Sequence, residues 1–190
     1  MKKATYILLF SMLGMTQCNT HTIPKPEGYF RITMPEVGYE IGSTHCGLTI
    51  EKPVYSILEN VENEKGGNSC WFNLSFPDYN ARFHCTEVEI NGNLESLMND
   101  SEEAVFTHEA KANGISRIRV NEKETGLYGV LYHLGGPVAT PIQFFVTDST
   151  NHFVRGSLYF NTSVNSDSTL PVVSRLLFDT EHLMRTVKWK

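Results

Sequence analysis

Cysteine and histidine side chains, the residue types that hold soft metal ions, gather at three places in this 190-residue chain. The places are His45-Cys46, Cys70 and His84-Cys85, which together offer two imidazoles and three thiols, a set suited to zinc or Cu(I). The spacing argues against a shared site, because neighbouring residues on a strand point to opposite faces, and each His-Cys pair could then give only one ligand. The sequence has no C-x₂-C or H-x₃-H unit. We therefore predict no metal ion and no cofactor.

A second group of reactive residue types, Asp148, Ser149 and His152, has the composition of a hydrolase site. These residues fall in a run of turn formers, where such side chains usually bond to the local backbone. The sequence also lacks a Gly-x-Ser-x-Gly elbow, a His-Glu-x-x-His unit and a Gly-rich phosphate loop after a strand. We therefore predict that the protein is not an enzyme.

The first residues have the features of an export signal. Lys2 and Lys3 form a basic start, and residues 6–13 are an apolar stretch of signal-peptide length. Cys18 follows, and a signal that ends on a cysteine is typical of a bacterial lipoprotein, whose thiol is acylated and anchors the chain in a membrane. Gln17 stands where a small residue is usual, so the alternative is a plain secretory peptide with an incidental cysteine.

Three segments follow from this interpretation. We predict a lipoprotein signal peptide over residues 1–17, an acylated Cys18 with a Pro-containing tether over 18–27, and a single α+β domain over 28–190. Pro24 and Pro26 favour extended backbone in the tether. A domain of this length can bury a sizeable core without a metal or a disulfide.

The domain alternates between β-branched or aromatic runs and turn residues, which is typical of strands. Two other segments carry apolar residues at three- and four-residue spacing, which is typical of amphipathic helices. The first helix is expected from the N-cap Asn93 to just before Gly114, and the second follows Ser168, with Pro171 in its first turn. Because strands and helices do not alternate, we predict an α+β fold, a mainly antiparallel sheet of about 6–8 strands covered by two amphipathic helices. The expected strands are 29–33, 49–57, 70–76, 81–90, 115–120, 127–134, 141–147 and 153–160.

Some strands have recognisable faces. Every second residue from Cys70 onward is apolar and faces inward, so that Trp71 lies on the partly wet face. The hairpin of 141–147 and 153–160 carries an amphipathic strip on its outer face, with Gln143 and Ser157 among its members. This strip either contacts a partner or is covered by the C-terminal helix or another segment. The candidates for an interaction surface are Trp71, Phe145, Arg155 and Tyr159.

The charge balance excludes a nucleic-acid partner. The chain has 16 Lys and Arg against 21 Asp and Glu, a net charge of −5, and no basic run beyond its first three residues. A protein that follows a phosphate backbone needs such a surface.

Four stretches of sequence carry a resemblance to a known family. They are PKPEGYFRI at 24–32, CWFNLSFPDYN at 70–80, QFFVTDSTNHFVRGSLYFN at 143–161, and the ending HLM with WK at 182–190. In this order, and along nearly the whole mature chain, they resemble the GldD family of gliding-motility lipoproteins. The resemblance implies a lipid-anchored cell-envelope protein of Bacteroidota-type bacteria, needed for gliding and associated with the motility and type IX secretion apparatus. It implies contacts with the membrane, through the lipid, and with other envelope motility and secretion proteins, and it transfers no catalytic or binding residue.

The same resemblance bears on the cysteines. The family carries cysteines at the positions of Cys46 and Cys70, which implies a disulfide between them in an oxidising envelope. Cys85 is then left over and shares its strand face with Phe83, which favours a buried free thiol. Pairing of Cys70 with Cys85 across adjacent strands is the alternative, and the sequence does not choose among the three pairings.

Two functions remain from these observations. The first is a structural or interaction protein of the envelope machinery, and the second is a periplasmic ligand- or metal-binding lipoprotein. The residues after Cys18, NTHTIP, lack the acidic run associated with surface export of lipoproteins in this phylum, which favours a periplasm-facing anchor.

Overall fold

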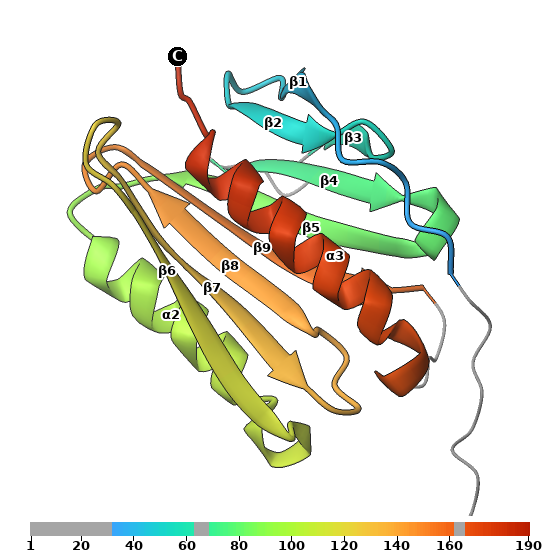
Figure 1. Cartoon of the computed structure of the whole chain (residues 1–190). Helices are drawn as coiled ribbons and strands as arrows, with labels where there is room; N and C mark the ends of the chain where they lie inside the picture. The colour runs from blue at the N-terminus through green and yellow to red at the C-terminus, as the bar shows by residue number, and fades with distance from the viewer. Residues whose placement is uncertain (1–31, 63–68, 162–165) are drawn as a thin grey trace, which may run out of the picture. The chain divides into compact units, whose positions relative to one another are not determined.

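The computed structural model describes residues 32–62, 69–161 and 166–190, which form a seven-stranded sheet, a two-stranded sheet and two α-helices (Figure 1). The expected signal peptide, Cys18, the tether and residues 29–31 of the first expected strand lie outside the described residues. The strands are β1 (Tyr39–Ser43), β2 (Thr49–Pro53), β3 (Ile57–Val61), β4 (Cys70–Phe76), β5 (Ala81–Glu89), β6 (Gly114–Glu122), β7 (Leu127–Gly135), β8 (Ile142–Thr147) and β9 (His152–Phe160). The helices are α2 (Leu94–Phe106) and α3 (Ser166–Arg185), with short 3₁₀ turns η2 (Pro77–Tyr79) and η3 (Glu109–Lys111).

The large sheet has the strand order β3-β4-β5-β9-β8-β7-β6, and every neighbouring pair is antiparallel. Strands β3 to β5 form one meander and β6 to β9 form a second. The chain passes from β5 through α2 to the far edge strand β6, and the second meander then returns until β9 pairs with β5. The predicted α+β fold with a mainly antiparallel sheet is confirmed.

Six of the expected strands appear as β4 to β9, but the expected strand 49–57 is wrong as one element. Strand β2 ends at Pro53, which has no N–H to continue a ladder. Ser56 closes the turn, since its N–H and its hydroxyl both donate to the Pro53 carbonyl, at 3.0 and 2.6 Å. The chain thus reverses between β2 in the small sheet and β3 in the large one.

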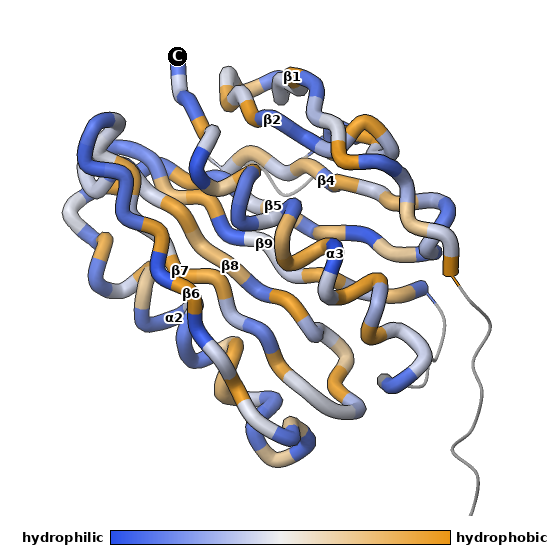
Figure 2. The backbone as a smooth tube through the Cα atoms, viewed as in Figure 1, coloured by the Kyte–Doolittle hydropathy of each residue, from blue (hydrophilic) through white to orange (hydrophobic). Residues whose placement is uncertain are grey.

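The two helices cover opposite faces of the large sheet (Figure 1). Alternate residues of β8 therefore enter different cores: Phe144 packs in the core with α3, and Phe145 packs in the core with α2. Figure 2 shows hydrophobic residues along the central strands and along α3, with hydrophilic residues in the β6–β7 and β8–β9 turns. Close approach of α3 requires Gly129 on β7, where a Cβ atom would lie 2.8 Å from Met184 Cε and 2.4 Å from the Phe145 carbonyl oxygen.

Helix α2 is shorter than expected. It ends at Phe106, and η3 follows before β6. The Thr107 hydroxyl donates to the Ala104 carbonyl at 2.7 Å, a local bond of the kind that competes with the helical ladder. Asn93 precedes the helix without capping it, because its side-chain oxygen accepts the N–H of Asn91 instead of a helical N–H.

Helix α3 begins at Ser166, earlier than expected, so that Pro171 lies in its second turn instead of its first. Its expected apolar stripe is confirmed. The stripe residues that are buried are Val173, Leu176, Thr180, Leu183 and Met184 in the helix, and Val187, which lies just beyond its end.

The small sheet of β1 and β2 is held to α3 by a buried carboxylate. Asp179, which is 2% exposed, accepts hydrogen bonds from Tyr39 Oη at 2.7 Å, from Arg175 Nε at 2.8 Å, and from Tyr55 Oη. Arg175 also donates to the Pro35 carbonyl at 3.0 Å. Two side chains of α3 therefore fix three segments: Arg175 bonds the chain before β1, and Asp179 bonds β1 and the β2–β3 turn.

Candidate functional site

The turn between β1 and β2 brings together two of the three Cys and His groups considered in the sequence, His45-Cys46 and Cys70. Cys46 lies in this turn and forms a disulfide with Cys70 at the start of β4, with a Cα–Cα distance of 6.2 Å. The bond links the small sheet to the large one. The pairing implied by the family resemblance is present, and the alternative of Cys70 with Cys85 is not.

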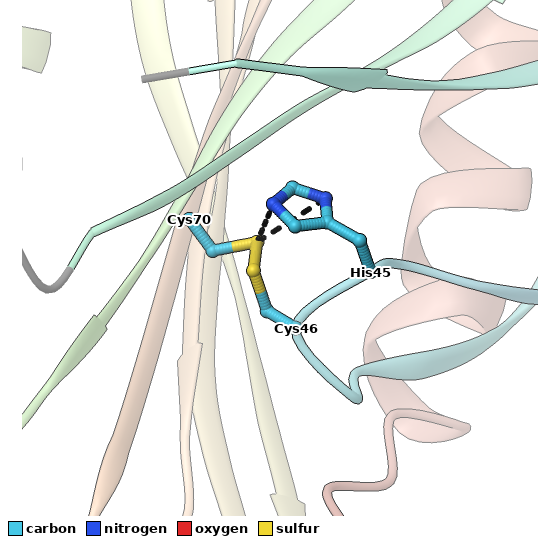
Figure 3. Close-up of side chains that lie close together, drawn as sticks. All are labelled: His45, Cys46 and Cys70. Carbon is cyan, nitrogen blue, oxygen red and sulfur yellow. Dashed lines mark hydrogen bonds between the residues drawn. A yellow bond between two sulfur atoms is a disulfide. The ribbon is translucent and has the colours of Figure 1, made fainter. Parts of the chain in front are cut away.

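His45 lies directly against this disulfide (Figure 3). Its Nε2 is 3.7 Å from Cys70 Sγ, and the ligand atoms of His45, Cys46 and Cys70 all lie within 4.8 Å of one another. The expectation that a His-Cys pair could give only one ligand is wrong here. It assumed a strand, whereas His45 and Cys46 occupy a turn, where side chains do not alternate between faces.

Asn60 of β3 selects the tautomer of the neutral His45 ring. The Asn60 side-chain oxygen accepts the backbone N–H of His45 at 3.1 Å, which orients the amide with its oxygen toward the turn. The same oxygen lies 3.1 Å from His45 Nδ1, which must then carry a proton because a carbonyl oxygen only accepts. The lone pair of the neutral ring is therefore on Nε2, the nitrogen nearer to Cys70.

A buried acid lies beside the disulfide. Glu87 of β5 is directly opposite Cys70 in the β4–β5 register, so the two side chains share one face of the sheet. Glu87 is 6% exposed, and its Oε1 lies 3.5 Å from Nδ1 of His152, whose ring stacks on Trp189. Burial raises the pKa of the Glu87 carboxyl, and the opposing effects of His152, Trp189 and His45 do not cancel it. Among the described residues, three buried side-chain atoms lack a hydrogen-bond partner: Thr44 Oγ1, Glu87 Oε2 and Trp189 Nε1.

The pair His84-Cys85 contributes nothing to this cluster. Cys85 is a free, buried thiol in the core under α3, and burial raises its pKa, whereas His84 is exposed on the opposite face of the sheet. The predicted buried thiol is present, and alternation along a strand does separate this pair.

In the hairpin turn between β8 and β9, the acid Asp148 has a structural role. Asp148 Oδ1 accepts the backbone N–H groups of Thr150, Asn151 and His152 at 3.0, 2.8 and 2.9 Å. Burial raises the pKa of Asp148, but these backbone bonds outweigh it and the pKa lies below its ordinary value. The carboxylate thus organises the turn, while the His152 ring faces Glu87.

The four expected surface residues do not all lie on a surface. Phe145 is 1% exposed in the core under α2, so its assignment to an interaction surface is wrong. The covering element is α2, not the C-terminal helix. Trp71, Arg155 and Phe145 belong to one row across the sheet, in which Trp71 pairs with Thr86, Thr86 with Arg155 and Arg155 with Phe145. Helix α2 covers the β8 end of this row and leaves the β4 end uncovered.

We call this uncovered half of the sheet the open face, defined by Trp71, His84, Thr86, Arg155 and Tyr159. Arg155 is exposed, Tyr159 is 41% exposed and Trp71 is half-buried. The rings of His84 and Tyr159 pack in a T-shaped arrangement, with centroids 5.5 Å apart. A cavity of about 260 Å³ separates the open face from α2, and its lining includes His84, Ser101, Tyr132, Gln143, Arg155 and Tyr159.

Sequence reasoning missed three residues that shape these sites: Asn60, Glu87 and Asp179. Glu87 carried a signal, because it falls on the inward side of its strand with Ala81, Phe83 and Cys85, where an acid is unusual. Asn60 and Asp179 act across 15 and 140 residues of sequence, and a spacing pattern does not show such contacts.

The family model described as gliding motility lipoprotein GldD matches residues 19–189 of the chain. No curated protein and no solved structure matches the chain. Within the part of the chain that the structure describes, neither helix combines the length and the apolar character needed to cross a membrane.

Proposed function

Because the chain belongs to the GldD family of gliding-motility lipoproteins, we propose that acyl chains on Cys18 anchor it in the cell envelope and that it supports gliding by binding other proteins, not by catalysis. The single observation that carries this proposal is the family match over nearly the whole chain. The partners are components of the motility and type IX secretion apparatus, and the domain faces the periplasm.

The open face is the surface that we propose for these contacts. It joins an exposed cation, Arg155, to the half-buried aromatic Trp71 and the exposed aromatic Tyr159. Arginine, tyrosine and tryptophan are the residue types enriched at protein–protein hot spots. Helix α2 covers the rest of this sheet face, including Phe153 of β9 and Val88 of β5, so β4 and the remaining parts of β5 and β9 supply the room for a partner.

Complementation of a deletion strain tests the proposal. Cells without the protein should form colonies that do not spread and should secrete less through the type IX pathway, and the wild-type chain should restore both. The Cys18→Ala variant should lose acyl labelling and fail to restore spreading, because the domain is no longer held at the membrane. Normal spreading and secretion in the deletion strain would contradict the proposal.

A charge reversal on the open face separates binding from folding. Arg155→Glu should accumulate to the wild-type level yet restore spreading poorly, because it places an acid where the partner meets a cation. Arg119→Glu is the matched control, since Arg119 is exposed on the distant edge strand β6. Equal spreading with both variants would show that the open face is not the contact surface.

A further inference from the structure

The β1–β2 turn, which carries Cys46 of the disulfide, has the donor groups of a metal site. The proposed gliding function does not use these groups. Two sulfur atoms and one imidazole lie within 4.8 Å of one another, contributed by Cys46, Cys70 and His45. The imidazole is oriented as a metal ligand usually is, with Nδ1–H bonded to the Asn60 oxygen and Nε2 left with its lone pair toward Cys70.

A buried acid lies on the same sheet face as Cys70, although its carboxylate is outside the group of donors that lie within 4.8 Å of one another. Glu87 is opposite Cys70 on the neighbouring strand, is 6% exposed and keeps one carboxylate oxygen without a hydrogen-bond partner. A buried carboxylate oxygen that lacks a hydrogen-bond partner is costly in a folded protein, even though the other oxygen of Glu87 faces His152. Two thiolates, one imidazole and one carboxylate form a four-ligand set within the range that zinc accepts.

We propose that reduction of the Cys46–Cys70 disulfide converts this cluster into a zinc site formed by Cys46, Cys70, His45 and Glu87. In the oxidised protein the two sulfurs are bonded to each other and the site is closed. The disulfide therefore decides whether the β1–β2 turn is tied to β4 by a covalent bond or by a metal ion.

The reductant is a dithiol. One of its thiolates attacks Cys46 Sγ, which belongs to the exposed member of the pair, and Cys70 leaves as a thiolate. The second thiol of the reductant then attacks the mixed disulfide, so that the reductant becomes a disulfide and Cys46 is released. Two electrons and two protons pass from the dithiol to the cysteines, and zinc displaces both thiol protons on binding.

Zinc binding by the full chain, purified in detergent, tests the proposal. After treatment with a dithiol and removal of oxygen, the wild-type protein should hold one zinc ion that resists gel filtration, and the oxidised protein should hold none. Cobalt(II) in place of zinc should give the thiolate-to-cobalt charge-transfer band of a site with cysteine ligands. Reoxidation should release the metal and restore the disulfide.

Matched variants identify the ligands. Cys85→Ser removes a buried thiol from the same sheet and should keep full binding, whereas Cys46→Ser should abolish it. His45→Ala and Glu87→Gln should each weaken binding, and Asn60→Ala should weaken it about tenfold by releasing the ring. Circular dichroism of each reduced variant checks that it remains folded. Binding that is equal in the oxidised protein, unchanged in Cys46→Ser, or absent from folded reduced wild type would overturn the proposal, and none of these results bears on the gliding function.

Discussion

Asp179 shows how much one side chain can organise in this protein. Its carboxylate receives donors from Tyr39, Tyr55 and Arg175, so three segments that are distant in sequence meet at one buried charge. Arg175 also stacks on Tyr55, with its guanidinium carbon 5.5 Å from the ring centre. This acid is therefore a major link between α3 and the small sheet, beside the contacts of His182 with Glu51 and Tyr39.

Replacing this acid should be costly. Asp179→Asn leaves the Arg175 guanidinium without its buried counter-ion, and we expect a loss of about 3 kcal/mol of unfolding free energy. Glu181→Gln is the control on the same helix, because the Glu181–Arg185 pair is partly exposed and should contribute less than about 1 kcal/mol. Urea denaturation of both variants measures the difference. Equal losses would mean that Asp179 has no special structural role.

At the residue scale the sequence was informative where a residue type restricts its partners. Cys46 and Cys70 were expected to pair, and Cys85 was expected to be buried and free. The role of Phe145 was not predictable, because an alternating strand shows which residues share a face but not which helix covers that face. His45 was misjudged because the sequence did not distinguish a turn from a strand.

At the scale of elements, periodicity was a good guide to the long segments. The stripe of α3 and the strands β4 to β9 were expected because each has many residues in a regular pattern. Strands β1 and β3 were missed because each has five residues, with sequences YEIGS and ILENV that contain charged or polar positions and little regular alternation. Each pairs with the strand that follows it in the chain, β1 with β2 and β3 with β4, and so short a run shows little of that pairing by itself.

Two leucines of α3 test the packing of this helix. Leu176 is 1% exposed against the sheet, whereas Leu170 is 54% exposed near the start of the same helix. Leu176→Ala should lose about 2–5 kcal/mol of unfolding free energy, because it removes buried methyl groups and leaves a cavity. Leu170→Ala should change the free energy by less than about 0.5 kcal/mol. Chemical denaturation compares them, and similar losses would show that α3 does not dock by its predicted stripe.

At the scale of the whole molecule, three tyrosines link stability to alkaline pH. Burial, and then the bond to Asp179, raise the pKa of Tyr39 to about 12 and raise the pKa of Tyr55. Burial and the bond to Glu102 raise the pKa of Tyr132. A phenol whose folded pKa is raised stabilises the fold fully below its unfolded pKa of about 10, and this contribution is lost as pH rises through the folded value.

We therefore expect the unfolding free energy to fall steeply above about pH 10. Tyr39→Phe should make this fall less steep, because it removes one of the phenols whose pKa the fold raises. Denaturation curves recorded between about pH 8 and pH 12 measure the slope. A slope that is identical in wild type and Tyr39→Phe would contradict this linkage.

The strand order also dictates when the sheet can close. One side of β5 pairs with β4, and its other side pairs with β9, from Ala81 with Phe160 to Glu89 with His152. The first meander therefore cannot complete its hydrogen bonds until residues far along the chain are present. Contacts of such long sequence separation form slowly. That edge of β5 therefore stays unpaired until β9, in the last third of the chain, is available, and an unpaired strand edge can act as a template for pairing with another chain.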